Sequence, residues 1–382
     1  MLPIAPPNVH RKFQFTDLNG NSNKFWEIKA WEAGGEWLTQ TIYGRVGDEN
    51  YWPAPNEAKP LGSFEKVERK IKDKTRPGRS TGTYQEVSIG NIVLDFGEGE
   101  IGRISRYIVD EASEYISTYF AGSTSDLSPE QIAMARDQLE KIGKLNAQWG
   151  YDDMMRRAVE RYFTIIPTIL PRKIDPEKVI KDFLDDLKEQ EERLNQLEAS
   201  IQVQQGTPSQ LLGVELSLAN EEEVAEVTRR IMNTRVHRGY EHLEIVNVFR
   251  IDEPRPFEDA GNAQLLFHGT RSRNVRHILR SGLTLPKVKS NGWAFGPGLY
   301  FADKFSKSAN YCSASKTKLI FIAEVGLGNM YVTPAAESYR TAPPNGYDSI
   351  AGIAGTTRGL MFNEYIVFNE RQQRLRYLVE YS

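Results

Sequence analysis

The stretch Leu265-Leu266-Phe267-His268-Gly269-Thr270-Arg271 is a short apolar run that ends in a histidine and a glycine. Two later segments are built in the same way: Gly298-Leu299-Tyr300-Phe301-Ala302-Asp303 and Phe362-Asn363-Glu364-Tyr365-Ile366. In each of them, one polar residue lies beside apolar residues that suit a buried strand. Their histidine, tyrosine and glutamate are therefore the leading candidates for functional residues.

Length, composition and net charge limit the classes of protein to which the chain can belong. The length of 382 residues suggests two or three domains, and an apolar fraction of 40% is enough for substantial cores. The formal net charge is -3, so the chain is not a uniformly basic nucleic-acid binder. Any role of that kind must come from a local patch.

Cysteine and histidine are scarce. Cys312 is the single cysteine, and with five histidines it forms no cluster typical of structural zinc. We expect no metal and no intrachain disulfide, and a reducing, intracellular compartment is the simplest interpretation. Residues 1–7 lack the features of a secretory signal, and no apolar run approaches the roughly 20 residues of a membrane helix. We therefore expect a soluble protein with no membrane partner.

Residues 8–97 are expected to form a small sheet with one helix. The segments 25–31 and 37–43 are rich in aromatic and β-branched residues, and Gly34-Gly35 separates them, which predicts a hairpin. Within residues 63–74, apolar residues recur at the spacing of one helix face.

This predicted helix carries a positive patch. Between Lys66 and Arg79, seven residues are basic and two are acidic. Lysine and arginine displace counterions from phosphate backbones, so such a patch can bind nucleic acid without selecting a base sequence. The simpler alternative is a solvated helix face, and the residues alone leave both interpretations open.

Residues 98–206 are expected to be helical. Ser128-Pro129-Glu130-Gln131 has a serine cap, a proline at the first helical position and a glutamine that can reach back, which predicts a helix start. Asp175-Pro176 predicts another helix, with an apolar stripe that runs to Ile201. Taken alone, this region is a helical bundle.

Residues 207–382 form the third predicted region. Residues 221–234 have helical periodicity, whereas 243–249 and 375–381 alternate as strands do. The nearly continuous apolar run 319–325 predicts a buried strand. The whole chain is thus predicted to be an α+β protein of three domains, with boundaries at 8–97, 98–206 and 207–382.

The motifs of the third region occur in an order found in one known family. His-Gly-Thr at 268–270, Gly-Leu-Tyr-Phe-Ala-Asp at 298–303, Ser-Lys-Ser-Ala-Asn-Tyr at 306–311 and Asn-Glu at 363–364 follow one another. This region resembles the catalytic domain of the poly(ADP-ribose) polymerase family, whose His-Tyr-Glu signature handles NAD. The resemblance implies a mixed, mainly antiparallel ADP-ribosyltransferase fold, with NAD as co-substrate.

The resemblance also implies a role for each matching residue. Cleavage of NAD at nicotinamide makes the ribose C1′ oxocarbenium-like, and a nearby carboxylate stabilises such a cation. Glu364 would supply that charge and polarise the acceptor, with Lys307 on the acceptor side, and His268 and Tyr300 would complete the catalytic set. The residues expected to bind NAD are His268, Gly269, Thr270, Asn274, Tyr300, Ser308 and Tyr311.

The first two regions resemble other parts of the same family. Tyr43-Gly44-Arg45-Val46-Gly47, between an aromatic strand and a basic helix, resembles the WGR domain, although Tyr43 replaces its tryptophan. A tyrosine ring can still stack on a terminal base. The resemblance implies binding to DNA ends or nicks, with contacts from Tyr43, Arg45, Lys70 and Lys74. Around residues 161–167 the second region resembles the helical regulatory domain, which implies a bundle that covers the NAD pocket until DNA binds.

These resemblances predict a DNA-break-stimulated enzyme that transfers ADP-ribose from NAD to protein side chains, its own included, and to growing chains. Trp293, Thr284 and Phe362 depart from the family's usual residues at the acceptor and adenosine ends, so polymer length stays open. The alternatives are a mono(ADP-ribosyl)transferase of the same fold and a catalytically silent scaffold that binds DNA ends. A dinucleotide-dependent oxidoreductase is a further, disfavoured alternative. A nuclear location fits a eukaryotic source, and the cytoplasm or nucleoid a bacterial or viral one.

Overall fold

The computed structural model describes most of the chain. The described residues are 7–46, 58–77, 83–87, 93–94, 96–121, 124, 127–148, 152–201, 205–236, 242–287, 293–313 and 317–382. Gly47 and Arg79, which belong to the WGR-like motif and the basic patch, lie outside these ranges.

The chain forms two compact units, and each is described by itself. The first comprises Met1–Ile92 and Ile116–Gln204, and the second comprises Val93–Tyr115 and Gln205–Ser382. Helix α2 (Gly99–Tyr119) therefore begins in the second unit and ends in the first. The three domain boundaries given above remain predictions.

The first unit contains the predicted sheet. Its five strands are β1 (Val9–Asp17), β2 (Ser22–Ala33), β3 (Glu36–Arg45), β4 (Lys59–Gly62) and β5 (Gln85–Val87), in the order β4-β3-β2-β1-β5 with antiparallel neighbours. Gly34 and Gly35 turn the chain between β2 and β3 with φ of 62° and 85°, the left-handed values that a two-residue hairpin turn needs. The predicted hairpin is confirmed.

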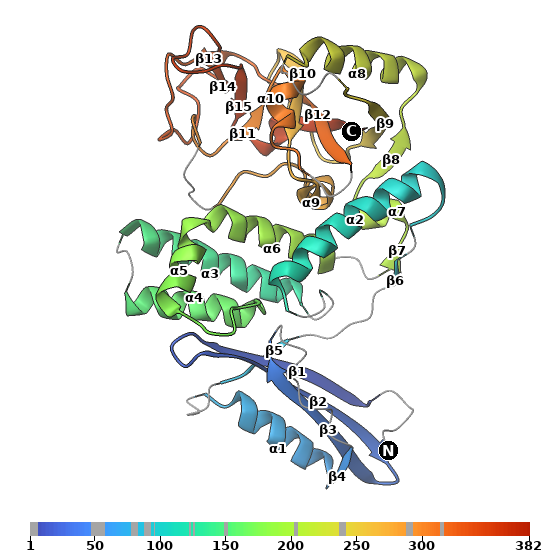
Figure 1. Cartoon of the computed structure of the whole chain (residues 1–382), viewed down its shortest axis with the longest axis vertical. Coiled ribbons are helices and arrows are strands. Elements are labelled where there is room, and N and C mark those ends of the chain that lie inside the picture. The colour runs from blue at the N-terminus through green and yellow to red at the C-terminus, as the bar shows by residue number, and fades with distance from the viewer. Residues whose placement is uncertain are drawn as a thin grey trace. The chain divides into compact units, whose positions relative to one another are not determined.

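Helix α1 (Phe64–Thr75) packs against this sheet (Figure 1). Val67 and Ile71 are buried against Phe13, Trp26 and Ile28, so the predicted helix and its inward face are confirmed. The third predicted apolar position, the aromatic residue at 64, is 41% exposed and lies beside the Trp37 ring at 4.9 Å between ring centroids.

The first unit also contains a helical bundle. Its helices are α3 (Pro129–Gln148), α4 (Asp153–Ile165), α5 (Pro176–Asp185) and α6 (Leu187–Ile201). The predicted start of α3 is confirmed, because the Ser128 and Gln131 side chains each bond the other's backbone N–H. The stripe predicted to follow Asp175 spans two helices, since Asp186 leaves helical geometry and its carboxylate accepts from Glu189 N at 3.0 Å.

Hydrogen bonds join the sheet to the bundle within this unit. The buried Asn23 donates its Nδ2 to Thr168 O at 2.8 Å, and Leu18 N donates to Glu160 Oε1 at 3.0 Å. Arg45 donates to Pro171 O at 2.9 Å. The β1–β2 turn and the end of β3 are thereby attached to α4 and to the segment between α4 and α5.

The second unit is built around two sheets. The first has the order β10-β12-β16-β9-β8 and is antiparallel: β8 (Glu215–Leu218), β9 (Ile245–Asp252), β10 (Ala263–Gly269), β12 (Lys318–Gly326) and β16 (Gln373–Tyr381). The second has the order β11-β15-β14-β13: β11 (Leu299–Phe301), β13 (Met330–Val332), β14 (Ser349–Gly352) and β15 (Glu364–Val367). Its β13–β14 pair is parallel and the others are antiparallel. The short strands β6 (Val93–Leu94) and β7 (Gln205–Gly206) pair in parallel.

Helices cover both faces of the first sheet. Residues of α8 (Glu221–Thr234) and α10 (Phe305–Ala309) share one core with it. The other core contains residues of α7 (Pro208–Leu212), α9 (Ser272–Ser281), the second sheet and the first half of α2. A 3₁₀ helix, η3 (Glu370–Gln372), precedes β16. The predicted α+β class is confirmed.

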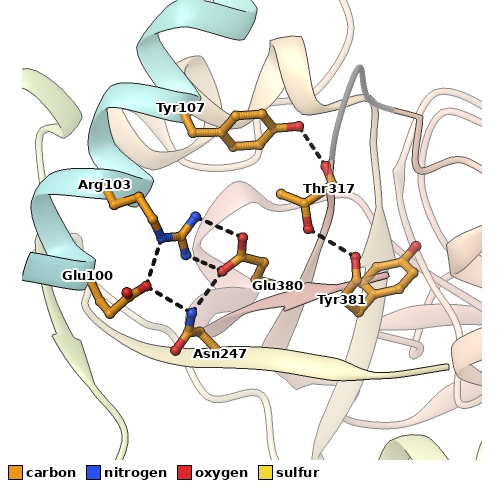
Figure 2. A network of polar contacts seen from close by, with 7 residues as sticks. All are labelled: Glu100, Arg103, Tyr107, Asn247, Thr317, Glu380 and Tyr381. Carbon is orange, nitrogen blue, oxygen red and sulfur yellow. Dashed lines mark hydrogen bonds and ion pairs between the residues drawn. The ribbon is translucent and has the colours of Figure 1, made fainter.

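The first half of α2 is attached to the first sheet of the second unit by polar contacts (Figure 2). Arg103 forms a two-pronged ion pair with Glu380 of β16, which also accepts from Asn247 Nδ2 of β9 at 2.9 Å. One turn later, Tyr107 donates its hydroxyl to Thr317 O at 2.6 Å. None of the described helices is long and apolar enough to cross a membrane.

Candidate active site

His268 lies at the end of β10, where the two sheets of the second unit meet. Phe267 and Ala302 exchange backbone hydrogen bonds of 2.8 and 3.0 Å, so the chain after β11 pairs with β10. The His268 Nδ1 lies 3.0 Å from Tyr300 O. A carbonyl oxygen only accepts, so Nδ1 donates to it.

Gly269 and Ser308 are in close contact. A Cβ on Gly269 would lie 1.7 Å from Ser308 O, a distance that no side chain tolerates. Glycine is needed at 269 because the backbone of α10 approaches it there. Ser308 is buried, and its hydroxyl donates to Phe267 O at 3.0 Å. Gly269 and Ser308, both expected to bind NAD, are thus adjacent.

Thr270 and Asn274, both expected to bind NAD, also contact one another. Asn274 lies in the first turn of α9 and donates its Nδ2 to the Thr270 hydroxyl at 3.3 Å.

Tyr300 is held rigidly by the turn that precedes it. Its hydroxyl donates to Gly296 O at 2.7 Å and accepts from Phe295 N at 2.9 Å. Burial raises the pKa of Tyr300, and the nearby Glu364 charge raises it further, so the phenol stays neutral. Gly296 has φ of 88° and meets Arg340 O where its Cβ would lie, which explains the glycine in this turn.

Glu364 begins β15 and forms an ion pair with Lys307 of α10. Their Oε1 and Nζ atoms are 2.6 Å apart, and the side chains are 12% and 21% exposed. Burial alone would lower the pKa of Lys307, but the Glu364 carboxylate outweighs it and the pKa lies above its ordinary value. The Lys307 Nζ also lies 5.5 Å from the centre of the Tyr311 ring, which is largely exposed.

The structure therefore connects the predicted site residues. His268 contacts Tyr300, Tyr300 lies within the electrostatic reach of Glu364 and Tyr311, and Lys307 contacts both of these last two. The arrangement has an aromatic wall, a carboxylate paired with a cation, and a histidine whose Nδ1 bonds a backbone carbonyl. It can bind a flat ring and stabilise positive charge that develops beside it.

Two residues of this region carried no predicted role. Asn363 Nδ2 donates to Asp303 Oδ2 at 2.9 Å, directly before the glutamate. Both lie inside the motifs quoted above: Asp303 is the last residue of the segment 298–303, and Asn363 directly precedes Glu364. The sequence signal was therefore their position next to the candidate residues.

The four expected DNA contacts lie in the first unit. Tyr43 is 50% exposed on β3, whereas Arg45 donates to the backbone of Asn21 and of the α4–α5 segment. On α1, burial lowers the pKa of Lys70, and Lys74 Nζ lies 5.6 Å from the Trp26 ring centre. Their contact with DNA remains a prediction.

Comparison with known proteins agrees with this architecture. The family model of the poly(ADP-ribose) polymerase catalytic domain matches residues 221–382, and that of the WGR domain matches residues 9–88. The chain is 26% identical to poly(ADP-ribose) polymerase 2-B of Oryza sativa subsp. japonica, over 95% of this chain and 70% of that protein.

Two vertebrate relatives match over shorter parts. Identity to poly(ADP-ribose) polymerase 1 of Gallus gallus is 28%, over 66% of this chain and 30% of that protein. Identity to poly(ADP-ribose) polymerase 1 of Xenopus laevis is 37%, over 38% of this chain and 18% of that protein. The chain thus spans less than a third of the length of these two relatives. The chain thus carries a WGR domain before a poly(ADP-ribose) polymerase catalytic domain, and relatives named poly(ADP-ribose) polymerase align with most of it.

Proposed function

We propose that this protein is a DNA-break-stimulated poly(ADP-ribose) polymerase. It transfers ADP-ribose from NAD to protein side chains, its own included, and to growing chains, and it releases nicotinamide. The observation that carries the proposal is the Lys307–Glu364 ion pair beside Tyr300 and His268. It brings a carboxylate, a cation and an aromatic wall together at the junction of the two sheets.

NAD binding would use the residues around β10 and α10. The nicotinamide ring stacks between Tyr300 and Tyr311, and its carboxamide bonds the Gly269 backbone and the Ser308 hydroxyl. Ser308 donates to Phe267 O and keeps its lone pairs for the carboxamide N–H. His268 binds a hydroxyl of the adenosine ribose through Nε2, since Nδ1 is committed to Tyr300 O.

The chemical step places Glu364 at the nicotinamide ribose. As the C1′–N bond breaks, the electron pair leaves with neutral nicotinamide and positive charge develops on the ribose. The Glu364 carboxylate bonds the ribose 2′-hydroxyl and stabilises this cation. An acceptor oxygen then bonds to C1′ from the opposite face. Where the acceptor is a hydroxyl, its proton passes to the Glu364 carboxylate and from there to water.

Lys307 has two consequences for this step. In the free enzyme it forms an ion pair with Glu364, with 2.6 Å between Nζ and Oε1. On the acceptor side it can meet a carboxylate or pyrophosphate of the incoming group. A substrate that engages Lys307 would thereby release Glu364 for the ribose.

Stimulation by DNA is supported by the organisation of the first unit. The WGR domain presents the exposed Tyr43 ring and the basic α1 helix, which suit a DNA end. Hydrogen bonds from Asn23, Leu18 and Arg45 join this domain to the helical bundle. We propose that DNA binding moves the bundle from a position that restricts NAD access.

One experiment separates the candidate functions. Purified protein is incubated with labelled NAD, alone and with nicked or blunt-ended DNA, and the products are resolved on gels. The proposed function predicts nicotinamide release and long labelled polymers, with more of both when DNA is present. Single labelled units would support a mono(ADP-ribosyl)transferase. Label that stays wholly in NAD, together with tight DNA binding, would indicate the scaffold.

The cellular location follows from the DNA partner. We infer that the protein acts in the nucleus if its source is a eukaryote, and at the nucleoid or in the cytoplasm if the source is bacterial or viral.

A further inference from the structure

The strand pairing changes beside Glu364. Strands β11 and β15 are antiparallel, with Tyr300 opposite Ile366 and Phe301 opposite Tyr365. Continued by one step, the ladder would place Ala302 opposite Glu364. Ala302 instead pairs with Phe267 of β10. On the side that faces β11, the backbone pairing of β15 therefore ends before Glu364.

A single side-chain amide spans the point where the ladder ends. Asn363 Nδ2 donates to Asp303 Oδ2 at 2.9 Å, on the side of β11. Its Oδ1 accepts from Ala354 N at 2.9 Å, on the side of β14. Gly352, two residues before Ala354, is the backbone partner of Glu364. Asn363 thus links the chain to both neighbouring segments directly before Glu364.

Asp303 is well suited to hold this amide. A hydrogen bond to an ionised carboxylate is stronger than one between neutral groups. The other carboxylate oxygen, Oδ1, is buried and accepts no hydrogen bond from the described residues. The Asp303 charge also acts on its surroundings: burial raises the pKa of Tyr365, and the carboxylate raises it further.

We propose that Asp303 and Asn363 are positioning residues that set the Glu364 carboxylate at the reacting carbon. They touch neither NAD nor the acceptor. They act through the backbone of β15, which would otherwise be free on one side at Glu364. The inference rests on the proposed function, because it takes Glu364 as the catalytic carboxylate. Transition-state stabilisation falls steeply when such a group is displaced by about 1 Å, so the rate reports on this link.

Exchanging the side chains at 303 and 363 tests the hydrogen bond between Asn363 and Asp303. Asn363→Asp is nearly isosteric but places a second carboxylate against Asp303, so the pair repels. Asp303→Asn keeps an oxygen that can accept from Asn363. The double variant Asp303→Asn with Asn363→Asp restores a donor and an acceptor in reversed order and keeps the original net charge. Ala354 N can donate to the residue at 363 in every variant.

We expect Asn363→Asp to lower turnover and the double variant to recover part of the loss. Asn363→Asp should lower kcat about 10- to 100-fold, with KM for NAD changed far less, because a displacement near 1 Å costs about that much. Asp303→Asn should lower kcat less. The double variant should regain about tenfold over Asn363→Asp, as expected for two groups in direct contact. A double variant that stays as slow as Asn363→Asp, with wild-type thermal stability, would overturn the proposal.

A matched pair at the other end of β15 serves as the control. Asn369 Nδ2 donates to Glu258 Oε2 at 2.9 Å, and Asn369 also caps η3. Asn369→Asp creates the same kind of carboxylate repulsion away from the site. Because Arg371 also pairs with the exposed Glu258, it should alter thermal stability less than Asn363→Asp does, and it should leave kcat unchanged. An equal fall in kcat would show that the effect of Asn363→Asp is only structural.

Ligand binding separates this inference from the proposed function. Benzamide carries the ring carboxamide of nicotinamide, so its Kd, measured by calorimetry, reports on the pocket without the reaction. Asn363→Asp should bind benzamide as the wild type does; a weakened Kd would show a collapsed pocket and contradict the proposal. Wild-type protein that leaves NAD intact with nicked DNA present would overturn the proposed function and this inference together. Active wild type without recovery in the double variant overturns this inference alone.

Discussion

At the scale of single residues, Lys307 and Glu364 form a partly buried ion pair at the proposed reacting centre. The raised pKa of Lys307 links this pair to stability. A lysine whose folded-state pKa lies above its ordinary 10.5 stabilises the fold fully below that value, and the contribution is lost as pH rises through the folded-state pKa.

Substitution of Lys307 tests this linkage. Lys307→Met should cost about 1 kcal/mol at neutral pH, and the difference from wild type should shrink as pH rises from 10.5, where the unfolded lysine titrates, through the higher folded-state pKa. Urea denaturation at several pH values measures both effects. Lys307→Arg, which stays charged, should keep the stability at high pH. A difference that does not vary with pH would contradict the assignment.

Glu364 is the residue on which polymer formation is expected to depend. Glu364→Gln keeps the shape but removes the charge that stabilises the ribose cation and polarises the acceptor hydroxyl. Elongation should fall by about 100- to 1,000-fold, the usual cost of removing one group that stabilises the transition state, with single-unit transfer or NAD hydrolysis remaining. Gel analysis of labelled products measures chain length. Polymers of normal length from this variant would refute the role of Glu364.

At the scale of elements, the first half of α2 belongs to the fold of the second unit. Figure 2 shows the guanidinium of Arg103 directed at Glu380, with Glu100 and Asn247 completing the network. Glu380 is only 2% exposed, so these donors must replace the water that a carboxylate loses on burial.

Removal of the arginine should therefore loosen this attachment. Arg103→Ala should destabilise the second unit by about 2–3 kcal/mol, because it leaves a buried carboxylate without its cation. Hydrogen exchange of the β16 and α2 amides measures the loss, and adding Glu380→Gln should recover part of it. Arg229→Ala removes an exposed pair with Glu226 and should change stability far less than Arg103→Ala does. Equal effects of both arginines would exclude a special role for the network.

Helix α1 is the element expected to bind the DNA backbone. Substituting Lys70 and Lys74 together by alanine should lower the slope of log Kobs against log salt by about 0.9 for each phosphate that the variant no longer neutralises. Fluorescence anisotropy with a nicked duplex over a range of salt concentrations measures that slope. Lys141→Ala changes an exposed lysine of α3 that pairs with Asp137 and should leave the slope unchanged. An unchanged slope in the double variant would place the DNA elsewhere.

At the scale of the whole molecule, the compact units suggest how to remove the helical bundle without damaging the catalytic unit. Residues Val93–Tyr115 pack with Gln205–Ser382, and Ile104 and Ile108 of α2 are fully buried in that core. Deletion of 98–206 would expose it. A chain in which 93–115 is joined to 205–382 keeps that packing.

This shortened chain tests the proposed restraint on NAD access. Residue 205 pairs with residue 93, so a segment that joins residue 115 to residue 205 must run back along α2. That distance is about 24 Å, and a linker of about 16 Gly/Ser residues can span it. It should consume NAD without DNA faster than the full chain does, and DNA should not stimulate it further. Basal activity equal to that of the full chain would refute an inhibitory bundle. Residues 207–382 alone should be less stable, since they lack the α2 core residues.

Much of this protein was predictable from local patterns. The Gly34-Gly35 turn, the inward face of α1, the cap at Ser128 and the apolar strand at 319–325 depend on neighbours in sequence, and the structure has each of them. The candidate residues His268, Tyr300 and Glu364 were also found from their motifs. Local propensity and periodicity suffice where the interactions are short in range.

Interactions between distant segments were decided only by the tertiary structure. The break at Asp186, the transfer of Ala302 from β15 to β10, the Arg103–Glu380 network and the attachment of Arg45 to the bundle all join residues far apart or depend on packing. A sequence pattern shows which residues are apolar or charged. It does not show which partner a buried charge will find, because that partner is set by how the chain closes on itself.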